Sequence, residues 1–131
     1  MKLNLIGLSV IALLLLACSH GQDMFLMKRD EILNRYAGAI RWGEWEKAAQ
    51  FQEPARRTRL DLAWLKTIHI ATYNPVFLQD DPKSKIVEQT VEIRYFIEPF
   101  GSEKTMTDRQ LWRFDDELDR WTLDSDLPAF R

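Results

Sequence analysis

The chain has 131 residues, with 18 Lys and Arg against 20 Asp and Glu and a formal net charge of −2. This balance excludes the strongly basic surface expected of a nucleic-acid-binding protein. The single cysteine excludes an internal disulfide, and His69 is the only histidine beyond His20, so we expect no zinc site and no cofactor.

The first 17 residues have the composition of a targeting segment. Met1-Lys2 gives a positive start, and Leu3 to Ala17 is almost wholly apolar. This apolar core is shorter than the roughly 20 residues that a membrane-spanning helix needs. A simple secretory cut after Ala17 would place the bulky Leu15 where a small residue is preferred. The segment therefore favours export by a different route.

Leu15-Leu16-Ala17-Cys18 resembles the lipobox of bacterial lipoproteins. The resemblance implies that Cys18 carries a diacylglycerol thioether, that the chain is cut before Cys18, and that the new amine is acylated. A thiolate suits this step because it is a strong nucleophile. Two or three acyl chains, at about 0.8 kcal/mol per buried methylene, would hold the protein on a membrane. Ser19, where an aspartate would signal inner-membrane retention in enterobacteria, favours the periplasmic face of the outer membrane.

Cleavage at this site divides the chain into three parts: a signal peptide over 1–17, a lipidated tether over 18–24 and a domain over 25–131. The mature part has 114 residues and a net charge of −3 once Lys2 is removed. That length supports one hydrophobic core, not two.

Helical spacing of apolar residues dominates the first part of this domain, from Phe25 to Lys66. Gly43 separates two helical runs, and Pro54 is expected to end the second. A short third helical turn is expected from Arg56 to Trp64. The apolar positions are Ile32, Leu33, Tyr36, Ala37 and Ile40 in the first run, and Trp45, Ala48, Ala49 and Phe51 in the second.

After Lys66 the apolar period changes to two, which predicts strands. In the first strand Ile68, Ile70 and Thr72 alternate with His69, Ala71 and Tyr73, and Asp80 to Ser84 forms a turn. In the second strand one face is apolar and the other polar, so one side of the sheet is expected to face water. That apolar face consists of Val87, Val91, Ile93, Tyr95 and Ile97. "TMTDRQLWRF" and "RWTLDSD" predict two more strands, joined by the acidic turn "DDELD".

Helices followed by an antiparallel meander predict an α+β fold, with N-terminal helices packed on a curved antiparallel sheet of three to four strands. The stretches "YAGAIRWGEWEKAAQF" and "QLWRFDDELDRWTL" resemble the opening helices and the closing hairpin of the cystatin-like group, which includes the nuclear transport factor 2 fold. The resemblance implies a cone-like pocket between sheet and helices and dimers through the sheet face. Some members of the group are isomerases or cyclases, and many only bind or assemble.

His69 is the one candidate for acid–base catalysis. As a general base it would have to pair with Asp61 or Asp108. The alternative is a half-exposed strand histidine without catalytic function. Asp115, Asp116, Glu117 and Asp119 offer oxygen atoms for calcium, but their spacing is that of an ordinary acidic hairpin turn, so we expect no metal.

Three groups of residues are candidates for contact with a membrane or a partner. Arg56, Arg57 and Arg59 form a basic cluster that would suit anionic head groups, or would simply be solvated. Trp42 is expected to be exposed, whereas Trp45, Trp112 and Trp121 are expected in the core. Exposed apolar area is expected at Phe96, Phe100 and Phe130.

Three functions are consistent with these features. The favoured one is a lipid-anchored, non-catalytic interaction or assembly module that binds an envelope protein, with a homodimer as a further expectation from the resemblance. The second is a pocket for an apolar small molecule or lipid. The third is an enzyme like the ketosteroid isomerases, using His69 and a carboxylate.

Substitution Cys18→Ser tests the lipid anchor. It removes the only thiol that can be acylated, so the variant is expected in the soluble fraction when cells are fractionated, while the unmodified chain stays with the membranes. Ser19→Ala serves as a control because it leaves the thiol in place. Membrane association of the Cys18→Ser variant would contradict the lipobox interpretation.

Overall fold

The computed structural model describes residues 25–99 and 101–131. The chain divides into two compact units, Met1–Ile32 and Leu33–Arg131. Of the first unit, residues 25–32 are described and are helical. The predicted signal peptide, Cys18, the tether and Phe100 lie outside the described residues. The second unit carries the sheet and all of the sites considered below.

Within the described residues, four helical segments precede the sheet. A long helix covers residues 25–41, followed by α2 (Trp45–Ala49), a 3-10 helix (Pro54–Arg56) and α3 (Leu62–Leu65). Gly43 breaks the first two helices with a φ of 65°, in the left-handed region that glycine adopts without strain. α2 ends at Ala49, earlier than predicted, and Pro54 instead begins the 3-10 helix, a position where its missing N–H costs nothing.

The predicted third helical turn over Arg56–Trp64 is wrong in its bounds. Helix α3 begins only at Leu62, because the Asp61 carboxylate accepts a hydrogen bond from the backbone N–H of Trp64 at 3.1 Å and so caps the new helix. Residues between the two short helices form a loop. Leu60 and Trp64 line a common cavity.

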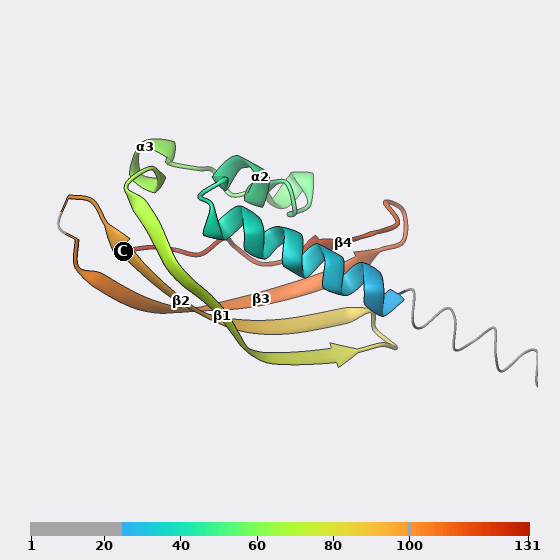
Figure 1. The fold of residues 1–131 in the computed structure, drawn as a ribbon. Coiled ribbons are helices and arrows are strands. Elements are labelled where there is room, and N and C mark those ends of the chain that lie inside the picture. The colour runs from blue at the N-terminus through green and yellow to red at the C-terminus, as the bar shows by residue number, and fades with distance from the viewer. Residues whose placement is uncertain (1–24, 100) are drawn as a thin grey trace, which may run out of the picture. The chain divides into compact units, whose positions relative to one another are not determined.

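The sheet has four antiparallel strands in the order β1-β2-β3-β4. They are β1 (Ile68–Asp81), β2 (Ile86–Ile97), β3 (Glu103–Asp115) and β4 (Arg120–Leu123). Figure 1 shows the helices on one face of a curved sheet, with β1 at its margin. The predicted α+β class and its helix-then-meander order are confirmed.

The two faces of the sheet differ as the alternation in β2 predicts. Val87, Val91, Ile93 and Tyr95 are buried on the inner face, toward the helices. Glu88, Glu92 and Arg94 are exposed on the outer face. In β3, Asp108, Gln110 and Trp112 lie opposite inner-face residues of β2 and are also buried.

Two register shifts interrupt the alternation of β1, between Ile70 and Thr72 and between Pro75 and Phe77. The first shift adds one residue to β1, so Tyr73, not Thr72, pairs with the inner-face residue Ile93. The expectation that Tyr73 shares a face with His69 is therefore wrong. Tyr73 is buried, and its neighbour Thr72 is exposed.

Aromatic side chains form the core. The Tyr36 ring meets the Trp112 ring edge-on with centroids 5.2 Å apart, and Phe51 packs against both. At the other end of the sheet, Phe130 contacts Trp45 and Tyr95. The expectation that Phe130 is exposed is wrong, because the chain after β4 folds back and places this ring in the core.

A buried glutamine joins the helical layer to the C-terminal segment. The Gln52 side chain donates to the Ser125 carbonyl oxygen at 2.8 Å and accepts from the Thr58 backbone N–H at 2.8 Å. The Leu123 N–H donates to the Phe51 carbonyl oxygen at 2.8 Å. Because all of these groups are satisfied, the fully buried Gln52 amide fixes the loop after α2 against β4.

Within the described ranges, no helix is both long enough and apolar enough to cross a membrane.

Candidate functional site

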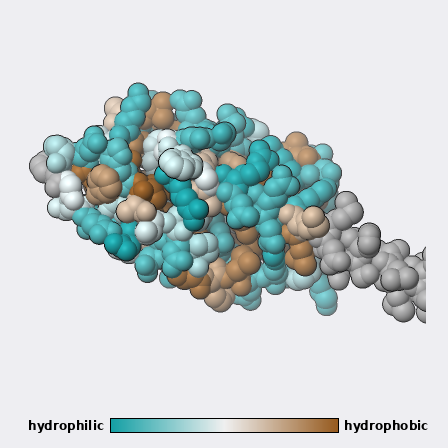
Figure 2. Space-filling view, in the orientation of Figure 1, coloured by the Kyte–Doolittle hydropathy of each residue, from teal (hydrophilic) through white to brown (hydrophobic). Residues whose placement is uncertain are grey.

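The margin of the sheet formed by β1 exposes apolar side chains. Every side chain from Asn74 to Asp81 is exposed. Val76, Phe77 and Leu78 are consecutive, and their exposed fractions are 55%, 53% and 43%. Figure 2 shows hydrophobic side chains gathered along the lower margin of the molecule, over the middle of β1. We call Val76–Asp81 the β1 edge segment.

The β1 edge segment also offers unpaired backbone groups. β1 pairs with β2 alone among the described strands, so its other side presents N–H and C=O groups to solvent. The edge is blocked before Val76: Arg41 Nη2 donates to the Tyr73 carbonyl oxygen at 3.1 Å, and Pro75 has no N–H to offer. The accessible edge is therefore short and begins at the exposed apolar residues.

A shallow hollow continues this surface onto the outer face of the sheet. Its volume is about 260 Å³, and Phe77, Thr90 and Arg109 form one of its walls, since these residues pair across three strands. Glu88 and Leu111 line the next row. The exposed Phe77 ring thus borders both the open edge and a concave surface.

The predicted contact residues are only partly near this surface. Trp42 is 81% exposed, as expected, and follows Arg41, whose guanidinium lies 5.6 Å from the centre of the Tyr73 ring in β1. Trp42 therefore stands close to the β1 margin. Phe96 is only half-buried, on the outer face, and Phe100 lies outside the described residues.

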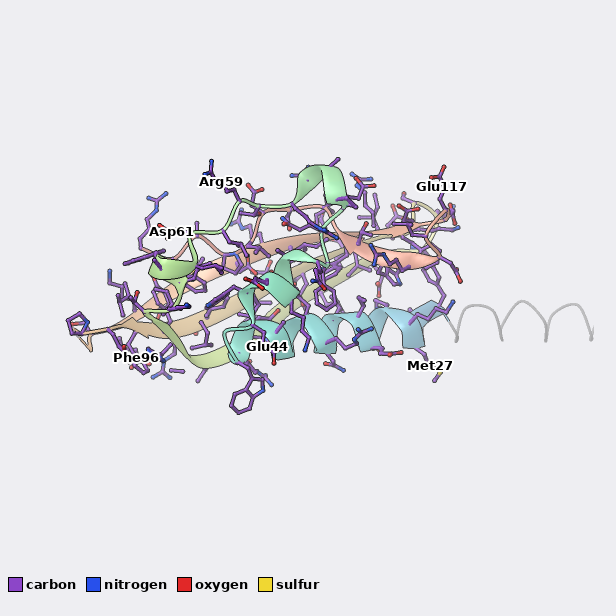
Figure 3. The ribbon with its side chains drawn as sticks, turned by 90° about the horizontal axis from the view of Figure 1, so that it is seen from above. Met27, Glu44, Arg59, Asp61, Phe96 and Glu117 are labelled. Atoms are coloured by element: carbon purple, nitrogen blue, oxygen red, sulfur yellow. The ribbon has the colours of Figure 1, made fainter. Side chains whose placement is uncertain are left out.

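The basic cluster lies on the 3-10 helix and the loop after it. Arg56 forms an ion pair with Asp124 at 3.1 Å, and Arg113 contacts the same carboxylate. Arg57 and Arg59 are exposed, and Figure 3 shows the Arg59 side chain projecting away from the ribbon. Among the described residues neither of these two guanidinium groups has an ion-pair partner, so both could contact an anionic surface.

His69 is not placed for the predicted catalysis. It lies opposite Phe96 on the outer face, and the two rings stack with centroids 5.0 Å apart. Its Nε2 atom lies 2.7 Å from Glu98 Oε1, but without the angle of a hydrogen bond. Asp108 is on the inner face, and Asp61 caps α3. The structure therefore does not bring His69 together with either predicted carboxylate.

A buried polar network, which the sequence pattern did not predict, lies instead on the inner face. The Gln110 Nε2 donates to Asp108 Oδ2 at 2.7 Å and to the Tyr73 hydroxyl at 2.9 Å, and Gln110 Oε1 accepts from Trp112 Nε1 at 3.1 Å. The Tyr36 hydroxyl is buried nearby and makes no hydrogen bond to a described residue. Polar residues at the alternate positions 108 and 110, in phase with the buried Trp112 of the same strand, were the available signal.

Burial raises the pKa of Asp108 to about 6, and the hydrogen bond from Gln110 offsets this only in part. Burial also raises the pKa values of Tyr36 and Tyr73, and the nearby Asp108 charge adds to both shifts. Such a carboxyl could exchange a proton near neutral pH. Its exposed fraction of 5% and the tight packing of Trp112 leave no described opening through which a substrate could reach it.

A separate cavity of about 340 Å³ lies between the α3 region and the C-terminal segment. Its walls are mainly apolar, with Trp45, Trp64 and Phe130 as aromatic residues. The Trp45 Nε1 already donates to the Leu65 carbonyl oxygen at 3.1 Å, so this indole N–H is not available to a ligand. The other lining residues are Thr58, Arg59, Leu60, Asp61, Leu65, Asp126, Leu127, Pro128 and Ala129.

The acidic turn between β3 and β4 is organised by its own backbone. Asp115 Oδ1 accepts from the N–H groups of Glu117 and Leu118 at 2.9 and 3.0 Å, and Lys85 pairs with Asp116 at 2.6 Å. In the described part of the chain, no three His, Cys, Asp or Glu side chains are grouped as ligands for a metal ion.

The chain matches no protein-family model and no curated protein. A solution structure of a SEC-C motif containing protein from Rhodopseudomonas palustris has a similar fold, with a TM-score of 0.53 and 15% sequence identity. The similarity covers 67% of this chain and 68% of that protein. It supports the α+β architecture and, at this identity, nothing beyond the fold.

The buried Asp108 predicts a pH-dependent stability. Its folded pKa of about 6 lies above the ordinary value of 3.8, so the folded state resists ionisation. Its contribution is therefore most favourable below pH 4 and is lost as the pH rises through 6. Asp108→Asn removes this loss and should stabilise the protein above pH 7 by up to about 3 kcal/mol, since each pKa unit corresponds to about 1.4 kcal/mol.

Urea unfolding of both proteins between pH 4 and pH 8 measures this difference. The gain from Asp108→Asn should grow between pH 4 and pH 6 and then level off. Asp126→Asn, at an exposed aspartate, is the matched control and should show no such growth. A difference that stays constant with pH would show that Asp108 ionises as easily in the folded state as in the unfolded chain.

Proposed function

We propose that this chain is a lipid-anchored assembly module of the bacterial cell envelope, which associates with another polypeptide by pairing a strand with the β1 edge segment. The observation that carries the proposal is the exposure of Val76, Phe77 and Leu78 on an open strand. Soluble proteins usually shorten, charge or cover such an edge, because it pairs readily with other chains.

Strand addition uses both properties of this surface. Main-chain hydrogen bonds to an added strand supply affinity, and side-chain contacts on alternate faces supply specificity. Here Phe77 lies on the outer face and Leu78 on the inner face, as their partners Thr90 and Gln89 show. An added strand would therefore bury apolar side chains on both faces of the sheet.

The lipid anchor is supported by the sequence. Cys18 follows an apolar run and ends the lipobox-like Leu15-Leu16-Ala17-Cys18. The tether of residues 18–24 spans at most about 25 Å at about 3.5 Å per residue, so the domain would stay near the membrane. The free Arg57 and Arg59 side chains suit the anionic surface expected there.

A catalytic function is less well supported than binding. His69 lacks both predicted carboxylates, and Asp108 is enclosed by packed aromatic residues. Both observations argue against the isomerase-like alternative, which requires an acid or base in contact with bound substrate.

Binding of an apolar small molecule remains the second candidate, on the single observation of the 340 Å³ cavity beside α3. Its volume lies within the range of about 300–1,000 Å³ typical of ligand pockets. Binding of an apolar fluorescent probe there should transfer energy from Trp45 and Trp64. Ala129→Trp should fill the cavity and abolish the signal, whereas Ala55→Trp, at an exposed position outside it, should not.

Site-specific photo-crosslinking tests the assembly function. A benzoylphenylalanine in place of Phe77 is expected to form a discrete polypeptide adduct in intact cells, identified by mass spectrometry. The matched control carries the same group at Leu118, which is 49% exposed in the β3–β4 turn, away from the edge. Val76→Asp should abolish the adduct at position 77, because a charge would be buried in the pairing.

Adducts of equal yield at positions 77 and 118 would reflect random collision. That result, or the absence of any adduct at position 77, would contradict the assembly function. Circular dichroism of the Val76→Asp variant keeps the interpretation clear, since this exposed position contributes little to the core.

A further inference from the structure

We infer that the cavity beside α3 binds a zwitterionic phospholipid, taking its head group at the mouth of the cavity and the first part of an acyl chain inside. The inference rests on the second candidate function above, because it names the ligand class of the same cavity. It does not depend on the β1 edge segment. The walls of the cavity suit an acyl chain, and the charges around its mouth suit the head group.

The walls are largely aromatic. Trp45 and Phe130 are buried, and their rings meet with centroids 5.4 Å apart. Trp64 is 39% exposed and Leu60 is half-buried, so apolar surface continues from the interior to the edge of the cavity. An acyl chain that covers this surface removes apolar area from water, which is the main source of affinity for such a chain.

The mouth of the cavity, where it opens to solvent, carries charges of both signs. Arg59, Asp61 and Asp126 line it, and all three are exposed. Among the described residues, no ion pair joins Arg59 to either carboxylate, and Asp126 has no other ion-pair partner. Only one oxygen of Asp61 is engaged, as the cap of α3. A ligand with one anion and one cation would satisfy both kinds of group, whereas a singly charged ligand would be repelled by one of them.

One buried side chain fixes the two loops that carry these charges. Gln52 Nε2 donates to the Thr58 hydroxyl at 3.0 Å and to the Ser125 carbonyl oxygen at 2.8 Å. Arg59 directly follows Thr58, and Asp126 directly follows Ser125. The opposite charges therefore stand on loops that are both held by the fully buried Gln52 amide. A site formed in advance in this way loses little conformational freedom when a ligand binds.

The chemistry of these groups assigns the two ends of the head group. The Arg59 guanidinium suits a phosphate, which it can bind through two hydrogen bonds, and Figure 3 shows this side chain projecting away from the ribbon. Asp61, Asp126 and the Trp64 ring suit an ammonium, because carboxylates and indole faces both attract cations. A free amino acid carries both charges on one carbon atom. The separated charges of phosphoethanolamine fit better between groups that do not contact one another.

Calorimetric titration of the full-length lipidated protein tests this assignment. The protein is kept in amphipol, because detergent monomers would compete for the cavity. Three ligands share a decanoylglycerol body: lysophosphatidylethanolamine carries both charges, lysophosphatidylglycerol carries only the phosphate, and monodecanoylglycerol carries no charge. Lysophosphatidylethanolamine is expected to bind about fivefold more tightly than either of the others, since one exposed ion pair contributes up to about that factor.

Removal of single charges locates the two contacts. Arg59→Gln and Asp126→Asn should each weaken the binding of lysophosphatidylethanolamine about fivefold and leave that of monodecanoylglycerol unchanged. Arg120→Gln and Glu117→Gln, at exposed positions outside the cavity, are the matched controls and should change neither affinity. Unchanged binding of the uncharged ligand shows that a variant keeps the cavity folded.

The remaining outcomes would each overturn the inference. Equal affinities for the three ligands would overturn the head-group assignment and leave an apolar ligand as the second candidate function. Tighter binding of decyltrimethylammonium would indicate a site for cations alone, and displacement by free phenylalanine at similar concentration would indicate a site for amino acids. Failure of all these ligands to bind would overturn the second candidate function as well, without bearing on the β1 edge segment.

Discussion

The fold depends on the burial of one face of the sheet beneath a single layer of helix, and Trp112 lies at the centre of that contact. Its ring is fully buried, meets Tyr36 from the long helix and Phe51 from the segment after α2, and its indole N–H is satisfied by Gln110. Truncation of a buried tryptophan typically costs about 3–5 kcal/mol. The helix, the sheet and the loop after α2 are held to one another through this residue.

The same contact explains why the inner face is poorly suited to a catalytic site. The margin of the sheet is better suited to binding. Aromatic packing around Trp112 encloses Asp108 and Gln110. Their polar groups therefore form hydrogen bonds inside the core, from Gln110 to Asp108 and from Trp112 to Gln110. The side chains of the second half of β1 are all exposed. Apolar residues at that margin stay about half exposed in the described chain, so an additional polypeptide packed there would bury further apolar surface.

Much of the architecture could be predicted from the sequence, because it follows from periodicity. The strict alternation in β2 determined which residues face the core, and Gly43 correctly marked the break between helices. The predictions of burial were wrong where one extra residue changes the strand register or where distant segments of the chain meet. The shift at Ala71 moved Tyr73 to the inner face, and the return of the C-terminal segment buried Phe130.

The candidate site was less predictable, for a related reason. Phe96 and Phe130 are aromatic residues at positions that the sequence pattern predicts to be polar, whereas the exposed apolar surface lies at "PVFL", residues 75–78. Proline inside a strand pattern indicates an edge strand, and three consecutive apolar residues after it cannot all face one core. This combination was a readable signal for an open edge. The network of Asp108 and Gln110 required the register of β3 against β2, which no local pattern supplies.

The opposite margin of the sheet determines how large an assembly can grow. β4 covers the end of β3, and the chain then returns along β3, with Ser125 bonded to Leu111 and the Arg131 carbonyl oxygen bonded to Lys104. In the described structure β1 is thus the one long strand left open. With one open edge strand in the described part of each molecule, strand pairing joins two partners and leaves no open edge for a third. Association through this margin would stop at a closed stoichiometry and would not proceed to fibres.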